Sequence, residues 1–118
     1  MNLGKFSLSL NVKDIDKSIQ FYTHLGFEII DGGHVNEIFK DNETMKWRIL
    51  KNSSVTIGIF QGMFDQNILT FYPTDLMTIQ SRLKTNDVSF IKEAKENGAM
   101  KITIILDPDG NQIMLEQL

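Results

Sequence analysis

The chain has 118 residues, a length typical of one domain with its own core, and a formal net charge of −3. It contains no Cys, which excludes a disulfide framework, a thiolate metal site and a thiol nucleophile, and it has no Lys/Arg cluster of the kind that binds nucleic acid. No apolar run approaches the ~18 residues of a membrane span and no signal peptide is visible, so we expect a cytoplasmic protein with neither membrane nor nucleic acid as partner.

The first residues predict a strand followed by a helix. Residues 5–12 alternate strictly between apolar and polar side chains, which is typical of a strand with one buried face. Asp14 then stands where a helix N-cap is expected, and apolar residues at helical spacing continue to Leu25. Gly26 is typical of a helix C-terminus, and a short strand is expected at 27–30.

The middle of the chain predicts a long loop and then two strands. Residues 34–45 are polar and patternless, so we expect a loop that can act as a lid. Strands are expected at 45–51 and 55–61, joined by a turn at 52–54.

The second half repeats this order. Residues 67–72 are strand-like, Asp75 mirrors Asp14 at the start of a helix, and another short strand is expected from Val88. Asp14 and Asp75 lie 61 positions apart, and so do Phe27 and Val88. The second helix is lined by four residues: Leu76, Ile79, Gln80 and Leu83. A repeat of this size predicts two similar units that share a core or a cleft.

The last residues predict a hairpin turn and a final strand. Residues 107–111, Asp-Pro-Asp-Gly-Asn, combine the residue types that tight turns require. From Asn111 onward polar and apolar residues alternate, so the face turned away from a helix layer should carry Gln112, Met114 and Glu116. The sequence therefore predicts an α+β fold of two tandem β-α-β-β-β modules, at about 4–62 and 66–118, within a single domain spanning 1–118.

Two stretches of this sequence resemble signatures of a known superfamily. Residues 12–22 with 25–28 are similar to the opening signature of the vicinal oxygen chelate superfamily, and residues 107–111 are similar to its closing signature. The superfamily includes glyoxalase I, bleomycin-resistance proteins and extradiol dioxygenases. The resemblance implies curved mixed sheets around an open trough with the helices outside, and a homodimer whose pocket lies within one chain or is shared through exchanged halves.

The resemblance also indicates where the metal ligands of family enzymes would fall. Transferred residue by residue, these positions are Ser7, Ile68, Met114 and, to within one or two positions, Ile57. Hydroxyl, aliphatic and thioether groups do not replace the imidazole and carboxylate ligands that such metals need. We therefore expect no metal and no cofactor, and we do not expect a metal-dependent glyoxalase I.

The alternation further predicts which residues line the trough. In the first half these are Ser7, Ser9, Asn11, Ile57, Ile59 and Gln61, with Trp47 as a candidate for stacking on a planar ligand. In the second half they are Ile68, Thr70, Tyr72, Met114 and Glu116. An apolar floor with a few polar groups is typical of a small-molecule pocket, although such a surface can also pack upon itself as a core. Glu116 is the one carboxylate placed near the floor, so it is either a general acid or base with a raised pKa or an exposed residue near the chain end.

These observations lead to three functional hypotheses. The first is a metal-independent protein, similar to the bleomycin-resistance branch, that binds a small, partly apolar molecule. The second is a lyase or isomerase of the glyoxalase type that uses Glu116 or a metal at displaced ligands. The third is a non-catalytic interaction module with a filled trough.

Overall fold

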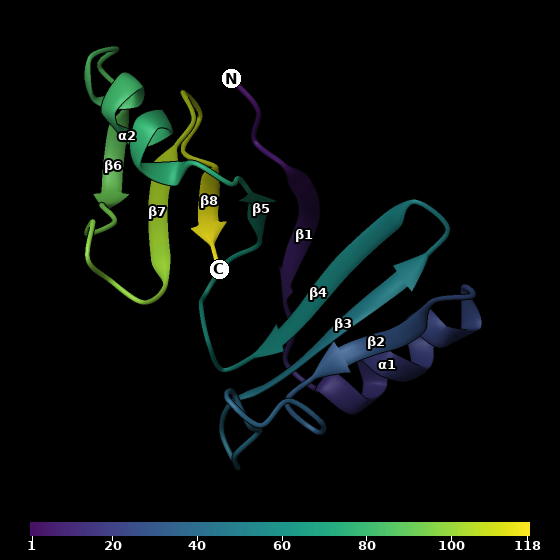
Figure 1. The fold of residues 1–118 in the computed structure, drawn as a ribbon. Helices are drawn as coiled ribbons and strands as arrows, with labels where there is room; N and C mark the ends of the chain where they lie inside the picture. Colours follow the sequence, from purple (N-terminus) through teal and green to yellow (C-terminus); the bar gives the residue numbers. More distant parts are fainter. The chain divides into compact units, whose positions relative to one another are not determined.

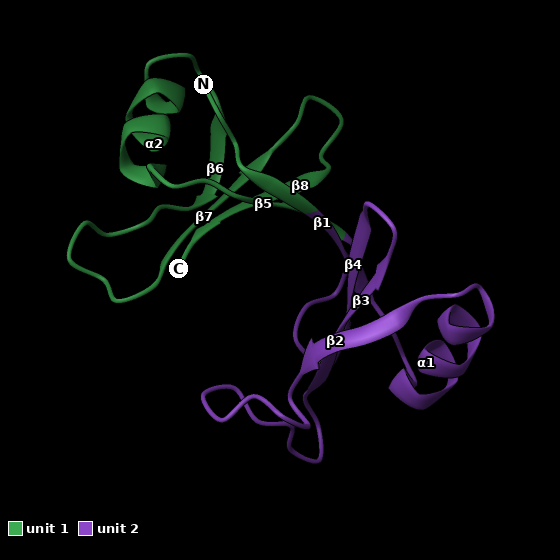
Figure 2. Ribbon diagram, turned by 45° about the vertical axis from the view of Figure 1, so that its right-hand side comes forward, with its two compact units in different colours: residues 1–6, 68–118 green, residues 7–67 purple.

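The computed structural model describes all 118 residues (Figure 1) and groups them into two compact units (Figure 2). Unit 1 comprises residues 1–6 and 68–118, and unit 2 comprises residues 7–67. The elements in chain order are β1 (Lys5–Asn11), α1 (Ile15–His24), β2 (Glu28–Gly32), β3 (Lys46–Asn52), β4 (Val55–Gln61), β5 (Ile68–Tyr72), α2 (Leu76–Lys84), β6 (Ser89–Lys92), β7 (Lys101–Leu106) and β8 (Gln112–Gln117). The predicted α+β fold with two β-α-β-β-β modules is confirmed, with element ends shifted by one or two residues.

In unit 2 the helix α1 packs on one face of the strands β2-β3-β4-β1, which are neighbours in that order. β1 runs parallel to β4, whereas β3 pairs antiparallel with both β2 and β4. The core between helix and strands consists of Ile15, Leu50, Ile57 and Ile59, none more than 6% exposed. Burying side chains of this size stabilises a fold by roughly 1.5–3 kcal/mol each, so this layer fixes the position of α1.

Unit 1 repeats the arrangement with α2 on the strands β5-β8-β7-β6. β5 runs parallel to β8, and β7 pairs antiparallel with both β8 and β6. Leu76, Ile79 and Leu115 form its buried core.

The first six residues belong to unit 1 because their side chains pack there. Leu3 lies against the core of unit 1, and the rings of Phe6 and Phe71 are 5.1 Å apart. Gly4 has a φ of +74°, and a Cβ at this position would lie 2.0 Å from the carbonyl oxygen of Tyr72. Only glycine therefore allows this close approach, which places the beginning of the chain on β5.

Both helices begin at an aspartate. The Asp14 carboxylate accepts hydrogen bonds from the backbone N–H groups of Asp16 and Lys17, at 3.1 and 3.3 Å. Asp75 accepts one from the N–H of Thr78, at 3.4 Å. These bonds satisfy N–H groups that lack a partner within the helix, as predicted for both N-caps. Neither helix has the length and apolar character needed to cross a lipid bilayer.

A glutamine at the end of a strand accepts a hydrogen bond from the first backbone N–H of each helix. In unit 2 the Gln61 side-chain oxygen accepts from the N–H of Ile15, and in unit 1 that of Gln117 accepts from the N–H of Leu76, both at 2.9 Å. Ile15 and Leu76 are 61 positions apart. The repeat therefore extends from the order of elements to the individual bonds that hold helix to strand.

The predicted hairpin turn at 107–111 is also present. Asp107 accepts backbone bonds from Asp109 and Asn111 at 2.9 and 2.8 Å, and a side-chain bond from Asn111 at 2.8 Å. The side-chain bond from Asn111 lowers the pKa of Asp107, and the backbone bonds lower it further. Gly110 has a φ of +86°, which glycine adopts without strain.

Candidate functional site

The face of unit 1 turned away from α2 carries the predicted residues of the second half. Because Phe71 and Leu115 pack toward α2, their neighbours along β5 and β8 point to the opposite side. Thr70 and Met114 are paired there, and Ile104 on β7 pairs with Met114 in turn. We call this side the distal face of unit 1; it carries Ile68, Thr70, Tyr72, Gln112, Met114, Glu116, Ile102, Ile104 and Leu106. The predicted alternation of the last strand is therefore correct, and a role for these residues in ligand binding stays a prediction.

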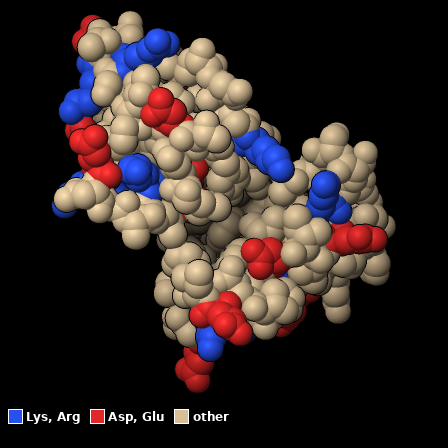
Figure 3. Space-filling model, viewed as in Figure 1, with Lys and Arg blue, Asp and Glu red and all other residues tan.

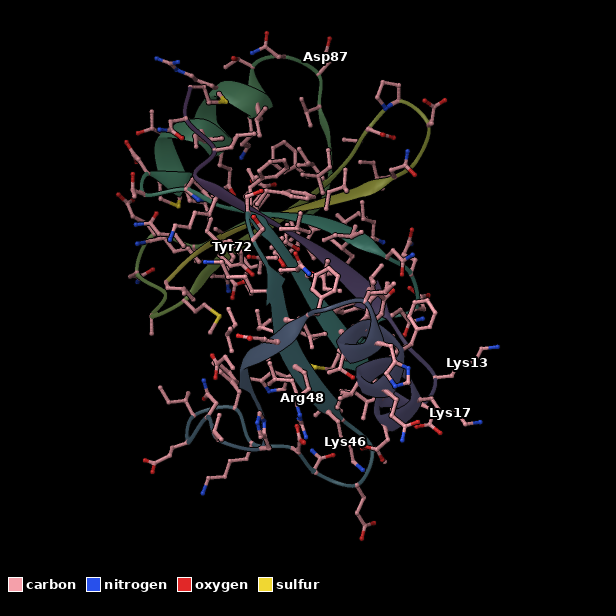
Figure 4. All side chains as sticks on the ribbon, turned by 90° about the vertical axis from the view of Figure 1, so that its right-hand side faces the viewer. Lys13, Lys17, Lys46, Arg48, Tyr72 and Asp87 are labelled. Carbon is pink, nitrogen blue, oxygen red and sulfur yellow. The ribbon has the colours of Figure 1, made fainter.

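Tyr72 and Glu116 are the ionisable groups at one end of this face. Burial raises the pKa of Tyr72 to about 12, and the charge of Glu116 contributes to the increase (Tyr72 is labelled in Figure 4). Burial alone raises the pKa of Glu116. Glu116 takes part in neither of the two salt bridges, Arg48–Asp41 and Lys84–Glu93. It is a half-buried carboxylate without a cationic partner, beside a phenol that stays protonated at neutral pH.

In unit 2, three predicted trough residues lie on the other side of the strands. Ile57 and Ile59 pack in the core under α1, and Gln61 bonds the first turn of α1, so their assignment to the trough was wrong. The cause is the register of the parallel pair, in which Leu8 stands opposite Ile57. Leu8 faces the helix, and directly paired residues point to the same side.

The distal face of unit 2, away from α1, is aromatic. Trp47 pairs with Phe60, and their rings are nearly parallel with centroids 6.4 Å apart. Phe64 lies against Phe60 at 5.1 Å. The same side carries the predicted residues Ser7, Ser9 and Asn11, together with Ile49 and Gly58. Phe60 and Phe64 lie near Trp47 in the sequence and are aromatic like it, and the strand register places Phe60 directly beside Trp47.

Ser7 is a buried polar group on that face. It is 3% exposed, and its hydroxyl oxygen has no hydrogen-bond partner. A buried hydroxyl without a partner costs free energy, which a hydrogen bond to a water molecule or a ligand group would offset.

The strand register determines where the family metal positions lie in each unit. Met114 pairs with Thr70, and the residue 61 positions before Thr70 is Ser9, which pairs with Gly58. The counterpart of Met114 is therefore Gly58 and not Ile57. A Cβ on Gly58 would lie 2.4 Å from the ring of Phe60, so this ring fills the place of a ligand side chain.

The four positions do not fit the metal that the superfamily implies. They hold a hydroxyl, a glycine, an aliphatic group and a thioether, at Ser7, Gly58, Ile68 and Met114, and this donor set does not match the requirements of Zn²⁺ or related ions. Nor does any group of three or more His, Asp or Glu side chains lie close enough to hold an ion elsewhere.

The loop before β3 is held to its strand by side chains. Asp41 forms a 2.7 Å ion pair with Arg48 and accepts a 3.2 Å hydrogen bond from the backbone N–H of Trp47. The indole N–H of Trp47 donates to the carbonyl oxygen of Phe39 at 2.8 Å. Figure 4 labels Arg48 at the strand end of this loop. No sequence pattern indicated the Asp41–Arg48 pair, and the proposed lid role of the loop stays a prediction.

The surface of unit 2 has a shallow pocket of about 270 Å³ away from the predicted site. It is lined by Gly26, Glu28, Ile30, Lys51, Asn52 and Ser53. On the side of the molecule seen in Figure 3, Lys and Arg side chains are interspersed with Asp and Glu, without a broad area of one charge.

Comparisons with known proteins identify the family. The sequence model described as Glyoxalase/Bleomycin resistance protein/Dioxygenase superfamily matches residues 6–115. No curated protein sequence matches the chain.

Solved structures share the fold at low sequence identity. A member of this superfamily from Vibrio splendidus 12B01 is 18% identical, with a TM-score of 0.67 over 97% of this chain and 98% of that one. Methylmalonyl-CoA epimerase from Mycobacterium tuberculosis is 19% identical, with a TM-score of 0.67 over 96% and 87%. A Legionella pneumophila structure described as an NAD-dependent benzaldehyde dehydrogenase is 16% identical, with a TM-score of 0.71 over 96% and 98%. Likeness at this level shows the fold alone, whereas the family match covers nearly the whole sequence: this chain belongs to the glyoxalase/bleomycin resistance protein/dioxygenase superfamily.

Proposed function

We propose that this protein binds a small, partly apolar molecule through a distal sheet face, without a metal ion at the family positions. The observation that carries the proposal is the half-buried pair of Tyr72 and Glu116 beside the aliphatic and thioether side chains of unit 1. Ligand sites are mostly apolar surfaces with a few polar groups that fix orientation. A surface that only packs as a core has no need for a carboxylate without a partner, because burying it costs free energy.

Unit 2 supports the same proposal with different chemistry. The parallel rings of Trp47 and Phe60 provide a surface on which a planar group can stack, and Ser7 offers a hydroxyl without a partner. Aromatic pairs contribute about 0.5–1.5 kcal/mol beyond the area that they bury.

A second candidate function is catalysis by Glu116, as in a lyase or isomerase. The raised pKa of Glu116 favours this candidate, because a carboxyl group that holds its proton nearer to neutral pH can exchange it with a substrate. A structure described as an epimerase has the same fold. Without family ligands the reaction would depend on Glu116 and Tyr72 alone, which is why binding is our first proposal.

The remaining expectations follow the family and the composition. A homodimer follows family precedent, and a cytoplasmic location agrees with a chain that has no Cys. Light scattering at two protein concentrations tests the dimer. A non-catalytic interaction module is the outcome that we expect if no small molecule binds.

A thermal-shift screen with small aromatic and aliphatic compounds, charged and neutral, tests the binding proposal. A ligand at 100 times its Kd stabilises the folded state by about 2.7 kcal/mol, which gives a clear increase in Tm. For a hit on unit 1, we expect Tyr72→Phe to weaken binding, whereas Tyr22→Phe, on the helix side of unit 2, removes the same hydroxyl without effect. A flat response across the library would contradict the proposal and favour the interaction module.

Metal analysis of the purified protein, together with an assay of turnover on a hemithioacetal substrate, tests whether the chain lacks the metal site and the glyoxalase I reaction of family enzymes. We expect substoichiometric metal and no turnover. One transition metal ion per chain together with turnover would overturn our interpretation of Ser7, Gly58, Ile68 and Met114.

A further inference from the structure

Glu116 combines three properties that no other carboxylate of unit 1 combines. It lies on β8 next to Met114 on the distal face, opposite Ile102 of β7. It is half-buried, and it has neither an ion pair nor a hydrogen bond. By contrast, Asp107 is tied into its turn by Asn111, and Glu93 pairs with Lys84 at 2.7 Å.

No cation forms an ion pair with Glu116. Across β7, Ile102 and Ile104 face the same side, and on β5 the neighbour is Tyr72. Two basic groups of unit 1 share this side. Lys92 lies on the far strand β6, where it pairs with Ile104, and Lys5 lies on β1 beside β5, since its neighbour Phe6 packs on the helix side against Phe71. Neither makes an ion pair with Glu116. A carboxylate in such a setting has lost water without gaining a counter-ion, which costs free energy until a cation binds.

We propose that the distal face of unit 1 binds a protonated amine carried on an apolar body, with Glu116 as its counter-ion. The inference rests on the proposed binding function and adds the charge of the ligand. The amine N–H groups donate to the Glu116 carboxylate and to the phenol oxygen of Tyr72, whose ring also attracts a cation at its face. The apolar body lies along Met114, Ile104 and Ile102, which are partly exposed on this face.

The donor set favours an organic cation over a metal ion. One carboxylate and one protonated phenol are too few ligands for Zn²⁺ or Ca²⁺, which take four or more. An ammonium group needs one negative charge and one to three acceptors, which this site provides. The aliphatic and thioether side chains beside it match an apolar chain or ring.

Calorimetry with matched pairs of ligands tests the proposal: hexylamine against hexanol, and 2-phenylethylamine against 2-phenylethanol. The members of each pair have nearly the same shape and differ in charge. We expect at least one amine to bind about tenfold more tightly than its alcohol, a difference that corresponds to about 1.4 kcal/mol, and to weaken as salt is added.

Variants then assign the preference to Glu116. Glu116→Gln should bind amine and alcohol equally, Glu116→Asp should keep part of the preference, and Glu96→Gln, which removes the same charge from an exposed loop, should behave as the unaltered protein. Circular dichroism of each variant confirms folding, and Glu116→Asp keeps the test valid if Glu116→Gln does not fold.

Three other results of these experiments would each refute a different part of the proposals. Equal binding of amine and alcohol by the unaltered protein would refute the cation and leave the proposed function standing. An amine preference that survives in Glu116→Gln would place the cation elsewhere and refute the role of Glu116. Binding of neither member of any pair, with a flat thermal-shift screen, would overturn both proposals.

Discussion

The two units share a plan, but they hold the connection between their second and third strands by different chemistry. In unit 1 the buried side chain of Gln80 bonds both the N–H and the carbonyl of Ala94, at 2.8 and 3.1 Å, and also accepts from the Thr103 hydroxyl. The residue 61 positions before Gln80 is Ile19, which packs with the apolar core of unit 2. Unit 2 instead ties its longer loop to β3 through the ion pair of Asp41 with Arg48.

Comparison of the two units shows that the contacts holding helix to strands recur, whereas the side chains of the distal faces differ. The N-cap aspartates, the strand-end glutamines and the β-bulges at Ile29–Asp31 and Phe90–Lys92 recur at the same places. The distal faces do not recur, because unit 2 has stacked aromatic rings where unit 1 has aliphatic side chains and Glu116. The same scaffold therefore presents two surfaces of different chemistry.

The largest expected effect concerns the equivalent core residues Ile59 and Leu115. They are 0% and 1% exposed, so Ile59→Ala and Leu115→Ala should each lower the free energy of unfolding by about 2–5 kcal/mol. Urea denaturation followed by circular dichroism measures the loss, and Val55→Ala, at a side chain 51% exposed, is the control with a small effect.

Hydrogen exchange sharpens this prediction. Ile59→Ala should reduce amide protection in β3 and β4 first, and Leu115→Ala in β5 and β7 first. A loss below about 1 kcal/mol for Ile59→Ala would mean that this side chain lies outside the core, contrary to its packing under α1.

The next effect tests the difference between the units. Gln80→Ala leaves the Ala94 N–H and the Thr103 hydroxyl without their partner, and it should cost about 2–3 kcal/mol. Gln20→Ala, on the exposed side of α1, should cost less than about 0.5 kcal/mol. Both losses in the free energy of unfolding are measured by urea denaturation. Equal losses would show that the hydrogen bonds of Gln80 do not stabilise the folded protein.

The fold was predictable because its signals are local. Asp14 and Asp75 mark helix starts by residue type, residues 107–111 contain every residue that a tight turn requires, and the 61-residue offset relates the two halves. The caps and the turn depend on bonds between residues close in sequence, and the offset is visible in the order of residues itself, so both can be placed without a structure.

The site was predictable only where one side of a strand is distinctly polar. In β8, Gln112 and Glu116 alternate with Ile113 and Leu115, and the distal face was assigned correctly. In β4, Ile57 and Ile59 alternate with Gly58 and Phe60, so both sides are apolar and the alternation does not identify the buried one. The pairing of Leu8 with Ile57 decides the question, and that contact spans 49 positions in the sequence.

The helix caps provide a smaller test of the repeat. Asp14→Ala and Asp75→Ala should each cost about 1 kcal/mol, with the greater loss for Asp14 because it caps two N–H groups and Asp75 caps one. Asp14→Asn and Asp75→Asn keep an acceptor and should recover most of the loss. Thermal unfolding of the four variants is the measurement, and a larger loss for Asp75→Ala would contradict the order expected from the bonds.

The smallest effect is the pH dependence of stability that Glu116 contributes from the distal face of unit 1. Burial raises its pKa in the folded protein, so the folded state holds the proton more tightly than the unfolded state, and the stability that results is present at low pH and lost as pH rises through the folded pKa. Glu116→Gln should therefore stabilise the protein above that pKa by on the order of 0.5 kcal/mol, allowing for solvent screening, and should have no effect below the ordinary value near 4.5. Glu96→Gln, which removes the same charge from an exposed loop, is the matched control. If Glu116→Gln instead destabilises the protein at neutral pH, the carboxylate already has a favourable partner in the folded state, and the need for a bound cation disappears with it.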